Sequence, residues 1–172
     1  LKFVGSATIG TDHMDITALQ QQGIAWSNAP GCNAQAVAEY VITALLHLRP
    51  ELLQQEQQFT LGIIGLGNVG RRLAYMAKLL DWHVIGYDPY VQLDQIENVS
   101  LDELLQRSNA VSIHVPLTKT GDYPTYHLIN ADRLACIPAQ TILINSARGP
   151  VIEEADLIEN IQKTQRQVVL DV

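Results

Sequence analysis

Apolar residues along this chain fall into two alternating kinds of segment. Continuously apolar runs, typical of parallel strands covered on both faces, occur at 2–5, 24–27, 60–65, 83–88, 110–115, 141–147 and 168–172. Segments with helical periodicity occur at 15–23, 34–48, 69–80, 101–107, 153–164 and from 131 onward. The alternation of the two predicts an α/β fold, a doubly wound parallel sheet of the Rossmann type.

Two parts of unequal size are expected. The glutamine-rich stretch 49–59 is the one polar low-complexity segment and the expected joint. Residues 1–32 are expected to be a remnant of a second α/β domain, and 33–172 the main domain with a leading interface helix at 33–48. That helix is apolar nearly all round, so burial on several sides is expected, in a core or a subunit interface.

Three polar residues are placed to cap helices. Asp15 and Asn33 precede the helices at 15–23 and 34–48, and Ser100 with Glu103 forms a capping box for the helix at 101–107.

The glycine-rich run GLGNVG stands between an apolar strand and a helix. Gly65 permits the tight turn, Gly67 lets backbone approach a pyrophosphate, and Gly70 allows the helix to pack on the strand. The N–H groups of Asn68 and Val69 then face the phosphates at the helix N-terminus. A glycine-rich turn or a methyltransferase loop remains the alternative.

Asp88 ends the next strand, where a carboxylate can accept both ribose hydroxyls of NAD and repel a 2′-phosphate. Pro89 and Tyr90 follow, with no cation for NADP, so NAD is the expected cofactor. A strand-end cap is the alternative role of Asp88. Arg71 and Arg72 are interpreted as solvated helix residues, with phosphate contact as the second option.

The motif NSARGP follows another predicted parallel strand, at the edge where open α/β sheets place ligands. A guanidinium offers a bidentate fork to a carboxylate, so Arg148 could hold a 2-hydroxy or 2-oxo acid and polarise its reacting oxygen. A surface arginine before a Gly-Pro turn is the alternative.

Together, GLGNVG, Asp88, SIHVPLT at 112–118, LINSARGP at 143–150 and VVLDV at 168–172 resemble the D-isomer-specific 2-hydroxyacid dehydrogenases. KFVGSATIGTDHMD at 2–15, PGCNAQAVAEYV at 30–41 and the insert GDYPTYHL resemble the branch of that family acting on 4-phospho-D-erythronate. The resemblance implies oxidation of this phosphorylated hydroxy acid to its 2-oxo acid with NAD, in vitamin B6 synthesis, by a homodimer.

The resemblance also implies residue roles. Thr8 would contact substrate, and Arg148 would be catalytic and line the nicotinamide side. The remaining cofactor residues would be Gly65, Gly67, Asn68, Val69, Gly70, Asp88, Val115, Ser146, Ala147 and Asp171. Val115 stands where the family usually has Thr, which leaves only backbone or packing contact there. Ala147 stands where this branch usually has Cys, and backbone can serve.

Oxidising a 2-hydroxy acid requires a base for the hydroxyl proton. The family supplies a histidine paired with an acidic residue, and both are expected beyond Val172. Because the chain begins with Leu1 and ends on a strand-like run, we expect a fragment lacking both ends and inactive by itself. His114 is the best internal substitute but is interpreted as structural. The other histidines, His13, His47, His83 and His127, have no acidic partner that the sequence identifies.

Two rival functions remain open. Another dehydrogenase of this family, such as a phosphoglycerate type, would differ in substrate. A non-catalytic NAD-binding module would bind cofactor without turnover. A methyltransferase fits less well, because it leaves NSARGP unexplained.

Charge and composition limit the classes of molecule that this chain is expected to bind. Eleven Lys and Arg against 18 Asp and Glu give a net charge of −7, which opposes nucleic acid and anionic membranes. The apolar stretch 37–48 is too short for a bilayer span and no leader opens the chain, so the cytoplasm is expected. Cys32 and Cys136 are interpreted as buried or incidental thiols, and no metal site is expected.

Overall fold

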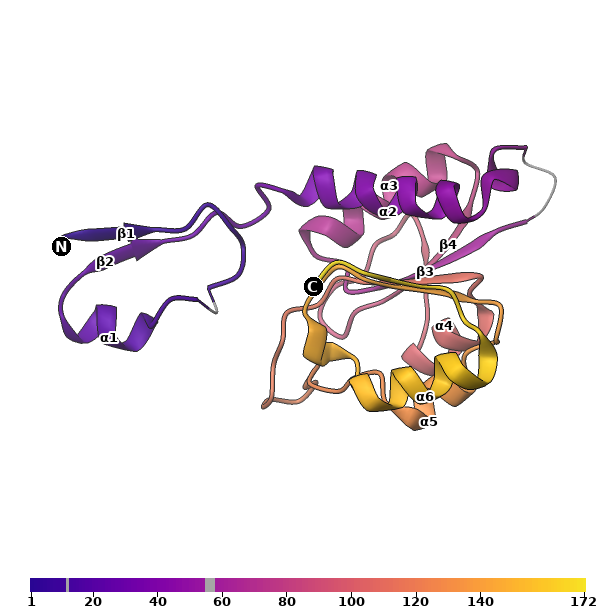
Figure 1. Cartoon of the computed structure of the whole chain (residues 1–172). Coiled ribbons are helices and arrows are strands. Elements are labelled where there is room, and N and C mark those ends of the chain that lie inside the picture. Colours follow the sequence, from indigo (N-terminus) through magenta and orange to yellow (C-terminus); the bar gives the residue numbers. More distant parts are fainter. Residues whose placement is uncertain (12, 55–57) are drawn as a thin grey trace.

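A six-stranded sheet forms the larger part of the chain in the computed structural model, which describes residues 1–11, 13–54 and 58–172 (Figure 1). Its strands lie in the order β5-β4-β3-β6-β7-β8, and every neighbouring pair is parallel. They are β3 (Thr60–Ile64), β4 (His83–Tyr87), β5 (Glu97–Asn98), β6 (Ala110–Ile113), β7 (Ile142–Asn145) and β8 (Val168–Leu170). The predicted doubly wound parallel sheet is confirmed.

Helices cover both faces of this sheet (Figure 1). They are α2 (Ala34–Leu48), α3 (Asn68–Leu79), α4 (Leu101–Arg107), α5 (Ala131–Cys136) and α6 (Glu154–Thr164), with 3-10 turns η1 (Pro50–Gln54) and η2 (Gly149–Val151). Alternate side chains of β3 serve the two layers: Leu61 and Ile63 join the core beneath α2 and α3, whereas Ile64 joins the core beneath α4, α5 and α6. The two-sided burial explains why the strands are continuously apolar.

A small unit precedes the sheet domain. It consists of β1 (Phe3–Gly5), α1 (Ile16–Gln21) and β2 (Ala25–Ser27), with β1 and β2 paired in parallel. Figure 1 shows it extending away from the six-stranded sheet and joined to α2 by a connecting segment. The predicted joint 49–59 contains η1, whose Leu52 is buried, and its residues 55–57 lie outside the described part. A domain boundary at 32/33 stays a prediction.

Helix α2 packs on the sheet domain with one face. Its buried residues, Ala34, Ala38, Val41, Ile42 and Leu45, form that face, while Ala36 and Tyr40 are exposed, so the core of this chain does not bury the helix on several sides and the expected subunit interface stays a prediction. Asn33 makes no side-chain capping bond; the backbone N–H of Ala34 donates to Gly31 O instead. The caps at Asp15 and Ser100 are confirmed, since the side chain of each accepts a hydrogen bond from the backbone N–H three residues later, that of Ala18 and that of Glu103.

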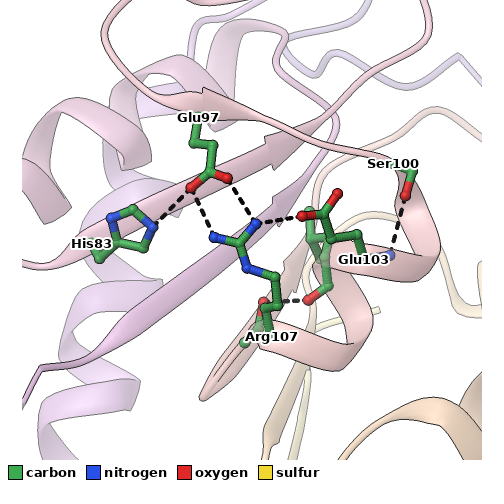
Figure 2. Close-up of polar contacts among 7 residues, drawn as sticks. His83, Glu97, Ser100, Glu103 and Arg107 are labelled. Atoms are coloured by element: carbon green, nitrogen blue, oxygen red, sulfur yellow. Dashed lines mark hydrogen bonds and ion pairs between the residues drawn. The ribbon is translucent and has the colours of Figure 1, made fainter.

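The edge of the sheet at β5 is held by charged side chains (Figure 2). Arg107 Nη1 lies 2.7 Å from Glu97 Oε1 and 2.5 Å from Glu103 Oε1, and Glu97 also pairs with His83. The Arg107 hydrogen bond holds the pKa of Glu97 below its ordinary value. These groups tie β4, β5 and α4 together at a surface that offers no apolar core, which is why the apolar pattern did not predict β5.

Both cysteines are free and exposed, so of the two interpretations of Cys32 and Cys136 the buried one is wrong and the incidental one remains. Among the described residues, no helix combines the length and the apolar character needed to cross a membrane.

Candidate functional site

The candidate residues gather where the parallel strands end. β3 lies between β4 and β6, so the chain leaves its carboxyl end toward one neighbour and returns later to pair with the other. Open α/β sheets bind ligands at this point of reversal, because loops diverge there and leave a crevice. The glycine loop, Asp88 and the NSARGP turn follow β3, β4 and β7, so the topology brings them to one edge.

Each glycine of the GLGNVG loop is required for a different reason. Gly65 has φ +93°, and a Cβ there would lie 2.5 Å from His114 O. A Cβ on Gly70 would lie 1.9 Å from Gly65 O, so only glycine lets α3 approach β3. Gly67 is exposed with nothing within 4 Å of a Cβ position. Open space at Gly67, directly before the first turn of α3, fits a pyrophosphate approaching the backbone.

Asp88 is held in place by backbone donors. Its Oδ2 accepts from Leu66 N at 2.8 Å, and its Oδ1 accepts from Tyr90 N at 2.9 Å and Val91 N at 3.1 Å. The carboxylate therefore caps the strand end and fastens it to the glycine loop. A carboxylate has about four acceptor positions, so three bonds leave roughly one, on Oδ2, for a ribose hydroxyl. Asp88 thus fits the cofactor, with one direct bond favoured over the expected two.

The NSARGP turn is organised by Asn145, a residue that the sequence analysis did not single out. Its side chain is buried; Oδ1 accepts from Ala147 N at 3.0 Å and Nδ2 donates to Arg148 O at 2.9 Å. Arg148 is partly buried, and its Nη1 donates to Ala147 O at 2.7 Å. The sequence did carry a signal for this role: an asparagine stands at the end of a strand predicted to be buried, and a buried amide must find hydrogen-bond partners.

His114 stands between the glycine loop and this turn. Its Nε2 lies 2.8 Å from Ser112 Oγ and its Nδ1 lies 3.3 Å from Ser146 Oγ. Burial lowers the pKa of His114 to about 4, because the charged ring would lose its hydration. A general base requires a pKa near the working pH, so the structural interpretation of this histidine is favoured.

A cavity of about 500 Å³ lies at the ends of β3 and β4, where Tyr87 and Pro89, the chain neighbours of Asp88, line it. Ile64 lines it at the end of β3, and Val115 lines it after β6. The predicted insert supplies much of the remaining wall through residues 122–128, and Asp102 and Arg133 contribute from α4 and α5. Apart from Val115, the cavity residues were missed, because they come from distant segments without a shared motif.

The other predicted residues lie at or beyond the edges of this site. Thr8 is exposed in the loop after β1, where its Oγ1 donates to Gly10 O at 2.9 Å. Thr8 O accepts from Ala29 N, which ties that loop to the connecting segment. Gly31 of the same segment lies against the Asn68 side chain. Asp171 follows β8, and its N–H donates to Asn145 O at 2.9 Å.

Two histidines have acidic partners that the sequence analysis did not identify. His83 Nε2 lies 3.2 Å from Glu97, and His127 Nδ1 lies 2.5 Å from Glu153. Both pairs join residues from different elements, which sequence spacing does not reveal. Arg71 and Arg72 are exposed as expected, with Arg71 Nε bonded to Gly67 O and Arg72 Nη1 to Gln35.

Curated relatives match along the whole chain. The chain is 72% identical over 172 residues to an erythronate-4-phosphate dehydrogenase of Acinetobacter baumannii (strain ACICU) and 69% identical over 172 residues to one of Acinetobacter baylyi. It is covered completely in both comparisons and spans about half, 48%, of each relative's length.

Solved structures agree. A D-lactate dehydrogenase from Treponema pallidum superposes with a TM-score of 0.81 at 30% identity, covering 99% of this chain and 57% of the other. A D-lactate dehydrogenase from Aquifex aeolicus complexed with NAD and lactic acid superposes with a TM-score of 0.77 at 28% identity, covering 100% and 58%. The family model for the D-isomer specific 2-hydroxyacid dehydrogenase NAD-binding domain matches residues 43–172. The chain therefore belongs to the D-isomer specific 2-hydroxyacid dehydrogenase family, and its sheet domain is an NAD-binding domain.

Proposed function

We propose that this chain is part of an enzyme that oxidises 4-phospho-D-erythronate to the corresponding 2-oxo acid with NAD. The observation that carries the proposal is the 72% identity, over the whole chain, to a protein named for that activity. The grouping of the glycine loop, Asp88 and the Arg148 turn at one sheet edge supports it, because cofactor and substrate must meet there.

Cofactor contacts are assigned by position at that edge. Backbone of Gly65, Gly67, Asn68, Val69 and Gly70 surrounds the pyrophosphate, and Asp88 binds the ribose of the adenosine half. Val115 packs against the cofactor, and Ser146, Ala147 and Asp171 lie on the nicotinamide side. When bound, NAD accepts the hydride from the substrate carbon.

Arg148 binds the substrate carboxylate and polarises the oxygen that becomes a carbonyl. A guanidinium suits this role because it stays charged and presents parallel donors. Asn145 positions it by holding the carbonyl of Arg148. Thr8 contacts the substrate from the loop after β1.

The proton of the substrate hydroxyl requires a base, which we place outside these 172 residues, in the remainder of the full-length protein. Two observations support this placement: the curated relatives are about twice as long, and burial lowers the pKa of His114 to about 4. The 172-residue chain is accordingly expected to bind NAD without turnover.

A substrate panel on the full-length gene product tests the proposed activity. NADH formation with 4-phospho-D-erythronate and little with 3-phospho-D-glycerate is expected. Preference for the latter would favour the phosphoglycerate-type alternative, and NAD binding without turnover on either would favour a non-catalytic module. Near-enzyme rates from the 172-residue chain would contradict the placement of the base.

The cofactor role of Asp88 has its own test by calorimetry with NAD. Asp88→Ala is expected to weaken binding at least tenfold, since the ribose bond and the turn it caps are both lost. Asp94→Asn, a nearby exposed carboxylate, is the control and should bind as wild type does. Unchanged NAD affinity in Asp88→Ala would remove this residue from the site.

A homodimer in the cytoplasm, acting in pyridoxine 5′-phosphate synthesis, completes the proposal. Support for the dimer comes from α2, whose Ala36 and Tyr40 leave apolar area exposed. Light scattering of the full-length product would detect the dimer, and a monomer at micromolar concentration would contradict it.

Pyridoxine auxotrophy on deletion of the gene would support the proposed pathway.

A further inference from the structure

The insert that walls the cavity is a loop with a fixed base and a projecting tip. Thr118 N donates to Thr125 Oγ1 at 2.8 Å, and Thr125 N donates to Thr118 Oγ1 at 3.1 Å. Tyr126 N donates to Thr118 O at 2.9 Å, which closes the base a third time. Residues 119–124 form the tip and turn at Gly121, which has φ +100°. The base thus fixes where the tip stands relative to the cavity.

Tyr123 of the tip lines the cavity, and its ring also contacts that of Tyr90. The two ring centroids are 5.5 Å apart and the planes are perpendicular. Tyr90 is placed by Asp88, whose Oδ1 accepts its backbone N–H at 2.9 Å. The proposed ribose ligand therefore also holds the backbone of Tyr90, which places one ring of the aromatic pair close to it in the chain.

Both rings of the pair are accessible to a ligand. Tyr123 is 51% exposed and Tyr90 is 75% exposed, although both rings are largely apolar. Tyr126, the other tyrosine of the insert, is already engaged: His127 stacks on it at 3.8 Å, and Lys119 Nζ lies 4.8 Å from its centroid. Tyr123 and Tyr126 both line the cavity, and Tyr123 is the more exposed of the two, at 51% against 42%. The face of Tyr126 already carries a stacked ring, so Tyr123 is the better candidate for stacking a ligand.

We propose that Tyr123 is the stacking partner of the adenine base, braced by Tyr90, and that the tip 119–124 thereby sets the affinity for the adenosine half of the cofactor. The inference rests on the proposed placement of that half beside Asp88. Base–aromatic stacking contributes a substantial share of nucleotide binding because both partners present flat apolar faces.

Calorimetry on the 172-residue chain with NAD and with ADP-ribose tests the role of Tyr123. Tyr123→Ala is expected to weaken both ligands by the same factor, roughly five- to fifty-fold, because both carry adenosine. Tyr123→Phe keeps the ring and should stay within about twofold of wild type if stacking is the interaction. Tyr75→Ala, which removes a 66% exposed tyrosine on α3, is the matched control and should bind as wild type does.

Failure of the stacking role and failure of the proposed function give different results in this experiment. If wild type binds NAD and Tyr123→Ala binds NAD and ADP-ribose equally well, the stacking role is wrong. A loss for NAD but not for ADP-ribose would place Tyr123 at the nicotinamide half and overturn it too. A wild-type chain that binds neither ligand would overturn the proposed function and the inference with it. Unchanged thermal unfolding of Tyr123→Ala would show that the effect is local.

Discussion

At the scale of single residues, two glycines of the same loop lie in opposite surroundings. Gly70 has no room for a side chain because Gly65 O would lie 1.9 Å from its Cβ, whereas a Cβ on Gly67 meets nothing within 4 Å. Gly70 serves packing of α3 on β3, and Gly67 is the glycine proposed to serve the ligand.

Substituting these two glycines is therefore expected to give opposite results. Gly70→Ala should lower the free energy of unfolding by about 1–3 kcal/mol, because backbone must shift. Gly67→Ala should change stability by less than about 0.5 kcal/mol yet weaken NAD binding at least tenfold, because its methyl group enters the proposed phosphate space. Urea unfolding and calorimetry on both variants measure the two effects. Equal NAD affinity in wild type and Gly67→Ala would contradict the placement of the pyrophosphate.

His114 makes stability depend on pH in a window of its own. Burial lowers its pKa from 6.5 to about 4. Between these two values the ring is protonated in the unfolded chain but stays neutral in the folded chain. Stability is thus full above 6.5 and falls as the pH approaches 4, by up to roughly 3 kcal/mol. The lowered carboxyl pKa values of Glu97 and Glu159 contribute stability that is full above their ordinary value of 4.5 and is lost only below it, so they add no pH dependence in the window of His114.

His114→Asn tests this dependence by urea unfolding between pH 7 and pH 5. The variant is expected to lose less stability than wild type across that interval, because it has no ring to protonate. Parallel curves for the two proteins would show that folding leaves the pKa of His114 unchanged.

At the scale of elements, one buried arginine joins α5, β7 and α6. Arg166 is 4% exposed; its Nη1 donates to Pro138 O at 2.9 Å and Thr141 O at 3.0 Å, and its Nη2 donates to Ile137 O at 3.0 Å. Its Nε reaches Asn160 Oδ1 at 3.0 Å. The guanidinium satisfies carbonyls left at the end of α5, where no helical donor remains.

Arg166→Met is expected to destabilise the fold by about 2–4 kcal/mol, since several buried acceptors lose their donor. Arg72→Met, which removes an exposed arginine with a 3.3 Å bond to Gln35, should cost less than about 0.5 kcal/mol. Urea unfolding of both variants gives the comparison, and equal values would mean that water replaces the guanidinium at those carbonyls.

Element prediction succeeded where local signals were strong. The helix at Leu101–Arg107 has its predicted bounds because Ser100 caps it and apolar residues mark its face. The strands predicted to 115 and 147 end at Ile113 and Asn145, because pairing stops where the chain turns into the ligand edge. Two-residue β5 carries no apolar signal, and its place depends on pairing with β4.

At the scale of the whole molecule, cofactor binding and folding are linked. The glycine loop, Asp88 and the NSARGP turn come from three strand ends, so NAD spanning them binds the folded sheet and not the unfolded chain. NAD at one hundred times its dissociation constant should therefore add about 2.7 kcal/mol to the free energy of unfolding. Thermal unfolding at increasing NAD measures this, and NADP, which Asp88 is expected to repel, is the control. An unfolding temperature independent of NAD would contradict a site assembled across the sheet.

The sequence by itself determined the α/β class, the cofactor and the residues of the glycine loop. These follow from local patterns: apolar runs, helical periodicity, and glycines where backbone must turn or approach a phosphate. Tertiary structure decided the rest, because contacts between distant segments leave no trace in spacing. It showed Asn145 holding the NSARGP turn, Asp88 fastened to Leu66, and Tyr123 brought to Tyr90 across 33 positions of chain. Such residues, distant in the sequence, come into contact because the parallel strands that carry them end at the same edge of the sheet.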